Sequence, residues 1–160
     1  MDEADWGRRL ELLWASIEDQ REHDFLAAIE KLVAARPQDD AIGLFEHAYA
    51  LDSTGHSDLA VGRYRRALEL GLSGERRRRA VIQLASSLRN VGRAEESVAL
   101  LTAELDAGSD DLDDAVRAFL ALALTSVGRE REAISVALTA LAAHLPRYNR
   151  SLAAYARDIA

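Results

Sequence analysis

The residues best suited to acid–base or metal chemistry in this chain are its four histidines. They are His23, His47, His56 and His144, and none is followed four positions later by a second histidine. A zinc site needs three or four converging ligands, which this scattered pattern does not supply. Cysteine is absent, which excludes disulfides, thiolate metal ligands and a cysteine nucleophile. We therefore expect no metal and no other cofactor.

Two short clusters resemble sites in composition only. The stretch STGHSD brings together Ser53, His56 and Asp58. Neighbouring residues in a tight turn cannot form the line of nucleophile, base and orienting carboxylate that catalysis requires. The stretch DDLDDAV carries four aspartates without the glycine and closing glutamate of a calcium loop. These carboxylates suit the dipole at the start of a helix, and we expect no enzymatic activity.

The third cluster is the basic run from Arg76 to Arg79, in a chain whose formal net charge is −7. The run has three interpretations: the solvated start of a helix, one wall of a site for an acidic protein or peptide, or a grip on nucleic acid. Nucleic-acid affinity grows with the number of phosphate contacts, and an acidic chain without an extended basic stripe supplies few. A regulatory nucleic-acid binder is therefore the minor alternative.

Composition indicates the elements that must position these groups. The chain has 160 residues, including 30 alanines and 24 leucines but only two prolines. Alanine and leucine are strong helix formers, so an all-α fold is predicted. No apolar run approaches the length of about 18 residues that crosses a bilayer, and the acidic start does not resemble a signal peptide. We expect one cytoplasmic domain over residues 1–160.

A repeat becomes visible when the chain is compared with itself. The segments LDSTGHSDLAVGRYRRAL, LRNVGRAEESVALLTAEL and LTSVGREREAISVALTAL each run from a helix end through a glycine into a second amphipathic helix. Their glycines are Gly55, Gly92 and Gly128, spaced 37 and 36 positions apart. A weaker fourth copy precedes them, with His23 in place of the glycine. Small residues recur at three positions of the repeat, where two helices would approach closely: Ser16, Ala48, Ala85 and Ala121; Ala28, Ala60, Ser97 and Ala133; Ala35, Ala67 and Ala140, with Glu104 as the exception.

This register resembles the tetratricopeptide repeat, a helix-turn-helix unit of about 34 residues. The resemblance is nearest to compact bacterial proteins built almost wholly of such repeats. It implies a right-handed solenoid of four helix pairs over residues 9–40, 41–74, 75–110 and 111–146, with a capping helix over 147–159. The expected helices are 8–21, 24–36, 40–53, 57–70, 75–91, 94–106, 111–127, 130–144 and 147–159. Trp6 and Trp14 are expected to hold the first helix in place.

The resemblance also implies a function. Related repeat proteins bind peptides or helices along the concave surface formed by the first helix of each pair, so we expect a non-catalytic protein–protein interaction module with a protein or peptide partner. The alternative is a homo-oligomeric assembly protein, for example a homodimer. In this register Arg79 points into the groove, while Arg76, Arg77 and Arg78 should mostly reach water. The residues expected to line the groove are Phe45, Tyr49, Asp52, Arg79, Ile82, Ser86, Arg89 and Asn90.

Overall fold

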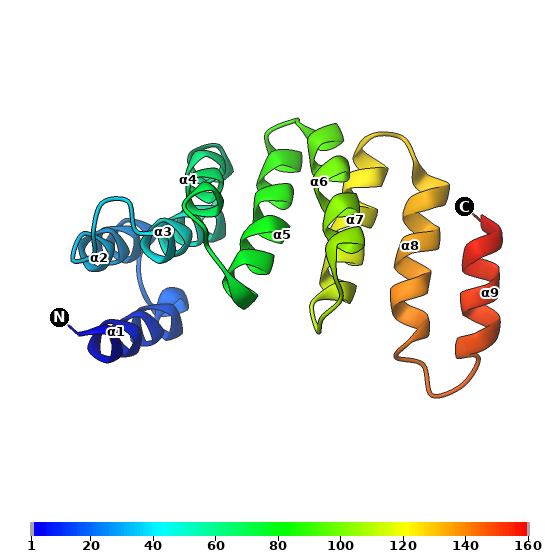
Figure 1. The fold of residues 1–160 in the computed structure, drawn as a ribbon, viewed down its shortest axis with the longest axis horizontal. Helices are drawn as coiled ribbons and strands as arrows, with labels where there is room; N and C mark the ends of the chain where they lie inside the picture. Colours follow the sequence, from blue (N-terminus) through cyan, green and yellow to red (C-terminus); the bar gives the residue numbers. More distant parts are fainter. Residues whose placement is uncertain (1, 160) are drawn as a thin grey trace. The chain divides into compact units, whose positions relative to one another are not determined.

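The computed structural model describes residues 2–159, and all regular structure in this range is helical (Figure 1). A short 3₁₀ helix, Ile17–Asp19, follows the first α-helix. The α-helices are α1 (Glu3–Ala15), α2 (Glu22–Val33), α3 (Ala41–Ser53), α4 (Ser57–Glu69), α5 (Gly74–Asn90), α6 (Ala94–Ala107), α7 (Asp113–Ser126), α8 (Glu130–Ala142) and α9 (Asn149–Ile159). The prediction of an all-α chain of helix pairs is confirmed.

The chain forms two compact units, and their boundary lies within α5. Unit 1 is Met1–Ala80 and unit 2 is Val81–Ala160. The single continuous domain expected from the sequence stays a prediction.

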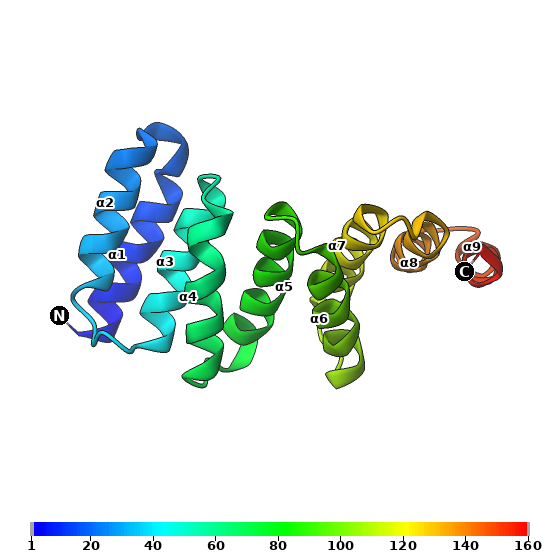
Figure 2. The same cartoon turned by 90° about the horizontal axis from the view of Figure 1, so that it is seen from above.

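In unit 1, α1 packs against α2, α2 against α3 and α3 against α4 (Figure 2). The core of the first two pairs contains Trp6, Leu10, Phe25, Ile29, Leu32 and Ala50. The indole N–H of Trp6 donates to the carbonyl oxygen of Leu32 at 3.1 Å. The Arg36 guanidinium lies 4.4 Å from the centre of the same ring. Trp6 thereby holds α1 against α2, as predicted.

The first helix differs from the predicted range of 8–21. It begins at Glu3, because Asp2 accepts a hydrogen bond from the Asp5 N–H at 2.7 Å and caps the helix. It ends at Ala15, where the Ser16 hydroxyl donates to the carbonyls of Leu12 and Leu13. Of the predicted helices, this one differs most from its observed bounds.

The turns within the three similar segments share one hydrogen-bonding pattern. Gly55, Gly92 and Gly128 have φ values of +88°, +81° and +75°. After each glycine, the next N–H donates to a carbonyl five residues earlier, from His56 to Leu51, Arg93 to Leu88 and Arg129 to Leu124. This is the left-handed glycine ending of a helix, and a side chain at these φ values would be strained. The repeat predicted from the spacing of the glycines is therefore confirmed by the backbone conformation of these turns.

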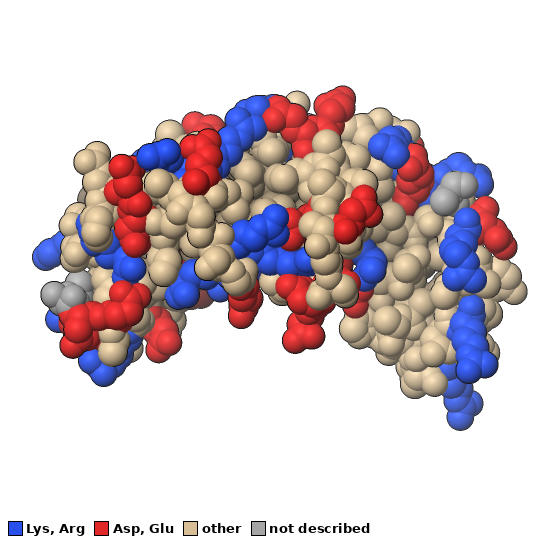
Figure 3. Space-filling model, in the orientation of Figure 1, with Lys and Arg blue, Asp and Glu red and all other residues tan. Residues whose placement is uncertain are grey.

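Unit 2 contains the C-terminal part of α5 and α6 to α9. Its core joins Ile82 and Ala85 of α5 to side chains of α6, α7 and α8, among them Val98, Leu101, Val116, Leu120, Leu124 and Ala133. Helix α9 packs against α8, where Ala142 and Ala156 are buried. Basic side chains gather along α9 (Figure 3). As expected of a capping helix, α9 covers α8 and presents a polar outer face.

Candidate functional site

The eight residues expected to line a groove are divided between the two units. Phe45, Tyr49, Asp52 and Arg79 belong to unit 1, and Ile82, Ser86, Arg89 and Asn90 belong to unit 2. One continuous surface formed by all eight stays a prediction.

In unit 1 the predicted aromatic residues belong to a larger group of rings in contact. The Tyr49 ring lies 6.1 Å from Phe45 and 4.5 Å from Trp14, measured between ring centres. Phe45 also contacts Tyr64 at 6.2 Å, and Trp14 meets Phe25 edge-on at 5.3 Å. Phe45 is completely buried, whereas Tyr49 and Trp14 are half-buried. Phe45 therefore packs beneath Tyr49 in the core, in contrast to the expectation that its ring lines a groove.

Arg79 is held against these rings. Its guanidinium carbon lies 5.3 Å from the centre of the Tyr49 ring and 5.5 Å from that of Phe45. Both distances are within the reach of about 6 Å for a cation–π interaction. The predicted proximity of Tyr49 and Arg79 is thus present in unit 1, with Arg79 fixed by the rings it covers.

A buried carboxylate, Glu46, completes the arrangement. One of its oxygens accepts from the Trp14 indole N–H at 3.2 Å, and the other accepts from Arg76 Nε at 3.4 Å. The Glu46 residue is only 4% exposed, so these two donors replace the water that a carboxylate requires. Glu46 therefore ties α1, α3 and α5 together within unit 1.

These side chains surround an open cleft of about 410 Å³. The cleft combines aromatic surface with two cations and two anions, and its lining residues are Leu10, Glu11, Trp14, Glu46, Tyr49, Arg76 and Arg79. All of them lie in unit 1. We name this feature the aromatic cleft.

Tyr64 is the deepest polar group behind the aromatic cleft. It is completely buried, and its hydroxyl has no hydrogen-bond partner among residues 2–159. Burial raises the Tyr64 pKa far above that of an ordinary tyrosine, and the charge of Asp52 adds to this effect. The phenol therefore stays neutral at physiological pH and serves packing.

In unit 2 the predicted groove residues do not form a comparable cleft. Ile82 is 4% exposed and belongs to the core, which corrects the expectation that it lines an accessible surface. Ser86 and Arg89 are half-buried and Asn90 is exposed. The Arg89 guanidinium donates to the Asn90 side-chain oxygen at 2.9 Å. Asp52, in unit 1, accepts from the Ser57 hydroxyl at 2.8 Å at the turn after α3.

The arginine run is less exposed than the sequence indicated. Arg76 pairs with Glu46, Arg77 is half-buried and Arg78 is only 6% exposed. The expectation that the first three arginines mostly reach water is wrong for Arg78. Four successive residues cover more than one turn of a helix, so one of them must face the packed side.

The histidines singled out in the sequence do not converge on one site. His56 Nε2 lies 2.7 Å from Glu22, and His144 Nε2 lies 2.8 Å from Asp114. Burial and the nearby charge of Arg63 lower the His47 pKa, so this imidazole is neutral at physiological pH.

Within residues 2–159 no three His, Cys, Asp or Glu side chains are grouped so that they could hold a metal ion. In the same range no helix is long and apolar enough to cross a membrane.

Sequence reasoning missed Trp14 and Glu46 as parts of the aromatic cleft. Between Ala41 and Leu51 the only acidic residue is Glu46, in a stretch that is otherwise mostly apolar. An acidic residue at such a position requires a partner, and this was the available signal. The identity of the partners, 30 to 32 positions away, could come only from the fold.

Paired helices joined by glycine turns define a helical-repeat protein. A family model for the tetratricopeptide repeat matches residues 41–159, more than half of the chain, and the chain belongs to this family. No curated protein matches the chain in sequence.

Two similar solved structures contain the nearly identical TPR-like repeats of a kinesin light chain-like protein from Podosopora anserina. The first, of a variant with one substitution, has a TM-score of 0.76 at 18% identity, covering 99% of this chain and 88% of the other. The second has a TM-score of 0.74 at 18% identity and covers 97% of this chain and 86% of the other. At this identity the similarity shows the fold.

Proposed function

We propose that the chain is a non-catalytic protein–protein interaction module that binds a peptide or helix of a partner protein in the aromatic cleft. Tetratricopeptide repeats generally mediate protein–protein interactions. The observation that carries the proposal is the half-buried pair Trp14 and Tyr49, whose ring centres lie 4.5 Å apart beside an open cleft.

The energetics of interfaces support this choice. A few aromatic residues and arginines at the centre of an interface supply most of its binding energy. The aromatic cleft offers both kinds, and Arg79 is already fixed over the rings. A side chain fixed before binding loses less conformational entropy on binding, which favours affinity.

The four arginines of the run do not support a nucleic-acid grip. Arg76 is engaged with Glu46, Arg78 is buried and Arg79 covers two rings. Few of these charges remain available for phosphate contacts, on which nucleic-acid affinity depends. A protein partner is therefore the better supported ligand of this region.

The test is a comparative capture from cell extract followed by mass spectrometry. Wild-type protein, Tyr49→Ala and Tyr155→Ala are immobilised in parallel, because Tyr155 is a 65% exposed tyrosine of α9 outside the aromatic cleft. A specific partner should be retained by wild type and Tyr155→Ala and lost from Tyr49→Ala, with binding weakened by about 2 kcal/mol. Equal retention of every captured protein by Tyr49→Ala and wild type would contradict the proposal.

A second candidate, homo-oligomeric assembly, is favoured by a separate observation. Leu12, Leu122, Ile134 and Leu141 are large apolar side chains that are at least 49% exposed. Surface of this kind, when contiguous, marks interaction sites. It lies outside the aromatic cleft, so self-association and partner binding do not exclude each other.

A further inference from the structure

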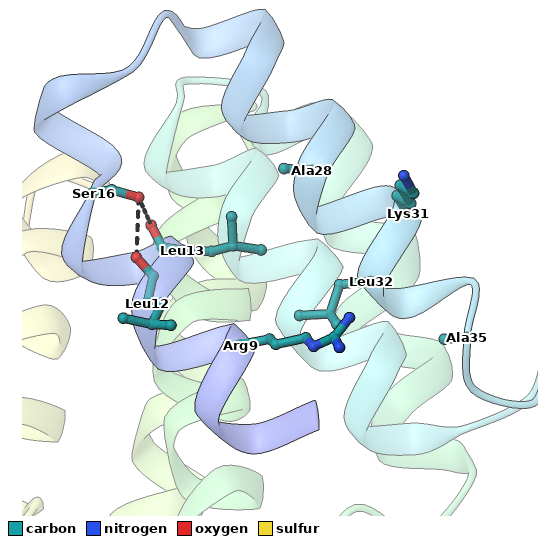
Figure 4. A pocket seen from close by; sticks show the side chains of 8 residues that line it. All are labelled: Arg9, Leu12, Leu13, Ser16, Ala28, Lys31, Leu32 and Ala35. Atoms are coloured by element: carbon teal, nitrogen blue, oxygen red, sulfur yellow. Dashed lines mark hydrogen bonds between the residues drawn. The ribbon is translucent and has the colours of Figure 1, made fainter. Parts of the chain in front are cut away.

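Two apolar grooves lie outside the aromatic cleft. The first, which we name the end groove, lies between α1 and α2 and has a volume of about 590 Å³ (Figure 4). Its walls include Leu12, Ser16, Ala28 and Ala35, and Leu12 is 66% exposed. The two charged residues of its lining, Arg9 and Lys31, are both cations.

The second groove lies between α7 and α8 in unit 2 and has a volume of about 640 Å³. We name it the α7/α8 groove. Its walls include Ala121, Leu122, Ala133, Ile134 and Ala140, with Leu122 50% and Ile134 49% exposed. Its one charged lining residue is an anion, Glu130.

The two grooves occupy the same register of the repeat. Ser16, Ala28 and Ala35 of the end groove correspond to Ala121, Ala133 and Ala140 of the α7/α8 groove. In the two inner repeats the corresponding residues are at most 3% exposed: Ala48, Ala60, Ala67, Ala85, Ser97 and Glu104. The small-residue positions that are buried in the two inner repeats thus line open grooves in the first and the last repeat.

We propose that these grooves pair between copies of this chain, the end groove of one copy against the α7/α8 groove of the next. Charge selects this head-to-tail pairing over the two symmetric ones. Two end grooves face to face would oppose Arg9 and Lys31 with their own copies, and two α7/α8 grooves would oppose Glu130 with Glu130. The mixed pairing places cations opposite an anion and avoids both repulsions.

The exposed leucines and isoleucine supply the apolar contact. Leu12 offers an apolar side chain to the alanine-lined α7/α8 groove, and Leu122 and Ile134 offer apolar side chains to the end groove. A contact between two different surfaces leaves one unpaired surface at each end of a dimer. Further copies therefore add to a wild-type dimer, and the average mass grows with concentration or stops at a ring.

The experiment blocks one groove at a time. Leu12→Asp disables the end groove and Ile134→Asp disables the α7/α8 groove, both at exposed positions where the fold should tolerate the change. Mass is measured by analytical ultracentrifugation up to about 1 mM protein, so that weak contacts are populated. Each variant alone should remain at the 17.6 kDa of one chain, whereas an equimolar mixture should form a species of twice that mass. Wild type should exceed the dimer mass.

The matched control is Leu59→Asp, which places the same charge on a 49% exposed leucine of α4 outside both grooves. It should associate like wild type. A charge reversal, Glu130→Lys, should weaken association without altering the apolar walls, and mixing it with Arg9→Glu should restore part of the lost affinity. Circular dichroism of every variant should match wild type.

Three outcomes would overturn the proposal. Wild type could stay monomeric at every concentration. Either blocked variant could still dimerise alone, which would show a symmetric contact. The mixture could fail to form the paired species although wild type associates, which would place the contact elsewhere. None of these outcomes bears on partner binding in the aromatic cleft, which the Tyr49→Ala capture tests separately.

Discussion

Unit 1 and unit 2 are built from the same helix pairs but packed with different side chains. Unit 1 contains six of the nine aromatic residues, and five of them form one chain of ring contacts: Trp14, Phe25, Phe45, Tyr49 and Tyr64. The core of unit 2 is aliphatic and alanine-rich, and its two tyrosines are exposed. The repeat therefore fixes the backbone, while the side chains decide what each unit can bind.

Aromatic packing should also make unit 1 sensitive to the loss of a single ring. Phe45→Ala removes a completely buried ring and should lower the free energy of unfolding by about 3–5 kcal/mol. Phe119→Ala in unit 2 should cost less, because Phe119 is only partly buried. Both tryptophans lie in unit 1, so urea unfolding followed by fluorescence reports on unit 1 and circular dichroism on the whole chain.

The two probes decide whether the units unfold separately. Repeat proteins are stabilised by neighbouring contacts, so a local loss need not spread evenly along the chain. Phe45→Ala should shift the fluorescence midpoint more than the midpoint by circular dichroism. Coincident midpoints for both variants would show that the two units unfold as one.

The small-residue register offers a second test within unit 1. Ala60→Leu adds volume at a completely buried position and should cost about 1–3 kcal/mol through overpacking. Ala28→Leu makes the same change at the corresponding position of the first repeat, which is half-buried beside the open end groove. Its cost should stay within about 0.5 kcal/mol. Thermal unfolding measures both, and equal losses would contradict the difference between inner and outer repeats.

Much of the fold could be predicted because the repeat is a local pattern. Three indicators placed most helices within a few residues of their observed bounds: glycines at a nearly constant spacing, small residues at three positions of the repeat, and apolar residues at helical spacing. The first helix is the exception. Its start depends on the Asp2 cap and its end on the Ser16 hydroxyl, two local hydrogen bonds outside the repeat pattern.

The candidate site could be predicted only in part. The register placed Tyr49 and Arg79 on one face, and the structure brings them together. It could not show that Phe45 and Ile82 are buried, because burial depends on how neighbouring helices pack. Nor could it show that Trp14 of α1 completes the aromatic cleft, since that contact joins residues 35 positions apart.

The two units can also be compared through one arginine–carboxylate pair in each. The pair in unit 1 should contribute more to the free energy of unfolding. Arg36 Nε donates to Asp40 at 2.6 Å, with both side chains less than 20% exposed. Burial raises the Asp40 pKa, but hydrogen bonds from Arg36 and from the Gly43 N–H outweigh it, so that the pKa lies below its usual value. Such a group stabilises the fold above its unfolded-state pKa, and this contribution is lost as pH falls through the folded-state pKa.

Asp40→Asn keeps a side chain that can cap α3 and removes the charge facing Arg36. At pH 7 it should lower the free energy of unfolding by about 1 kcal/mol. The difference from wild type should be smaller at about pH 3 than at pH 7, because the contribution of Asp40 declines as the pH falls below the usual aspartate pKa of about 3.9 and through the lower pKa of folded Asp40. Urea unfolding at both pH values measures this, and a difference of the same size in acid would attribute the loss to the cap.

The pair in unit 2, Arg129 and Glu132, should contribute least to the free energy of unfolding. Arg129 forms two hydrogen bonds with Glu132 and thereby lowers the Glu132 pKa, but the two side chains are 47% and 43% exposed. Water and salt screen such a pair, and fixing two long side chains costs conformational entropy. Glu132→Gln should therefore leave the urea midpoint at pH 7 unchanged within error, with or without added salt. A loss as large as that of Asp40→Asn would mean that the arginine after the glycine turn stabilises the repeat through its charge, and the equivalent pair of Arg93 and Glu96 would then be the next to test.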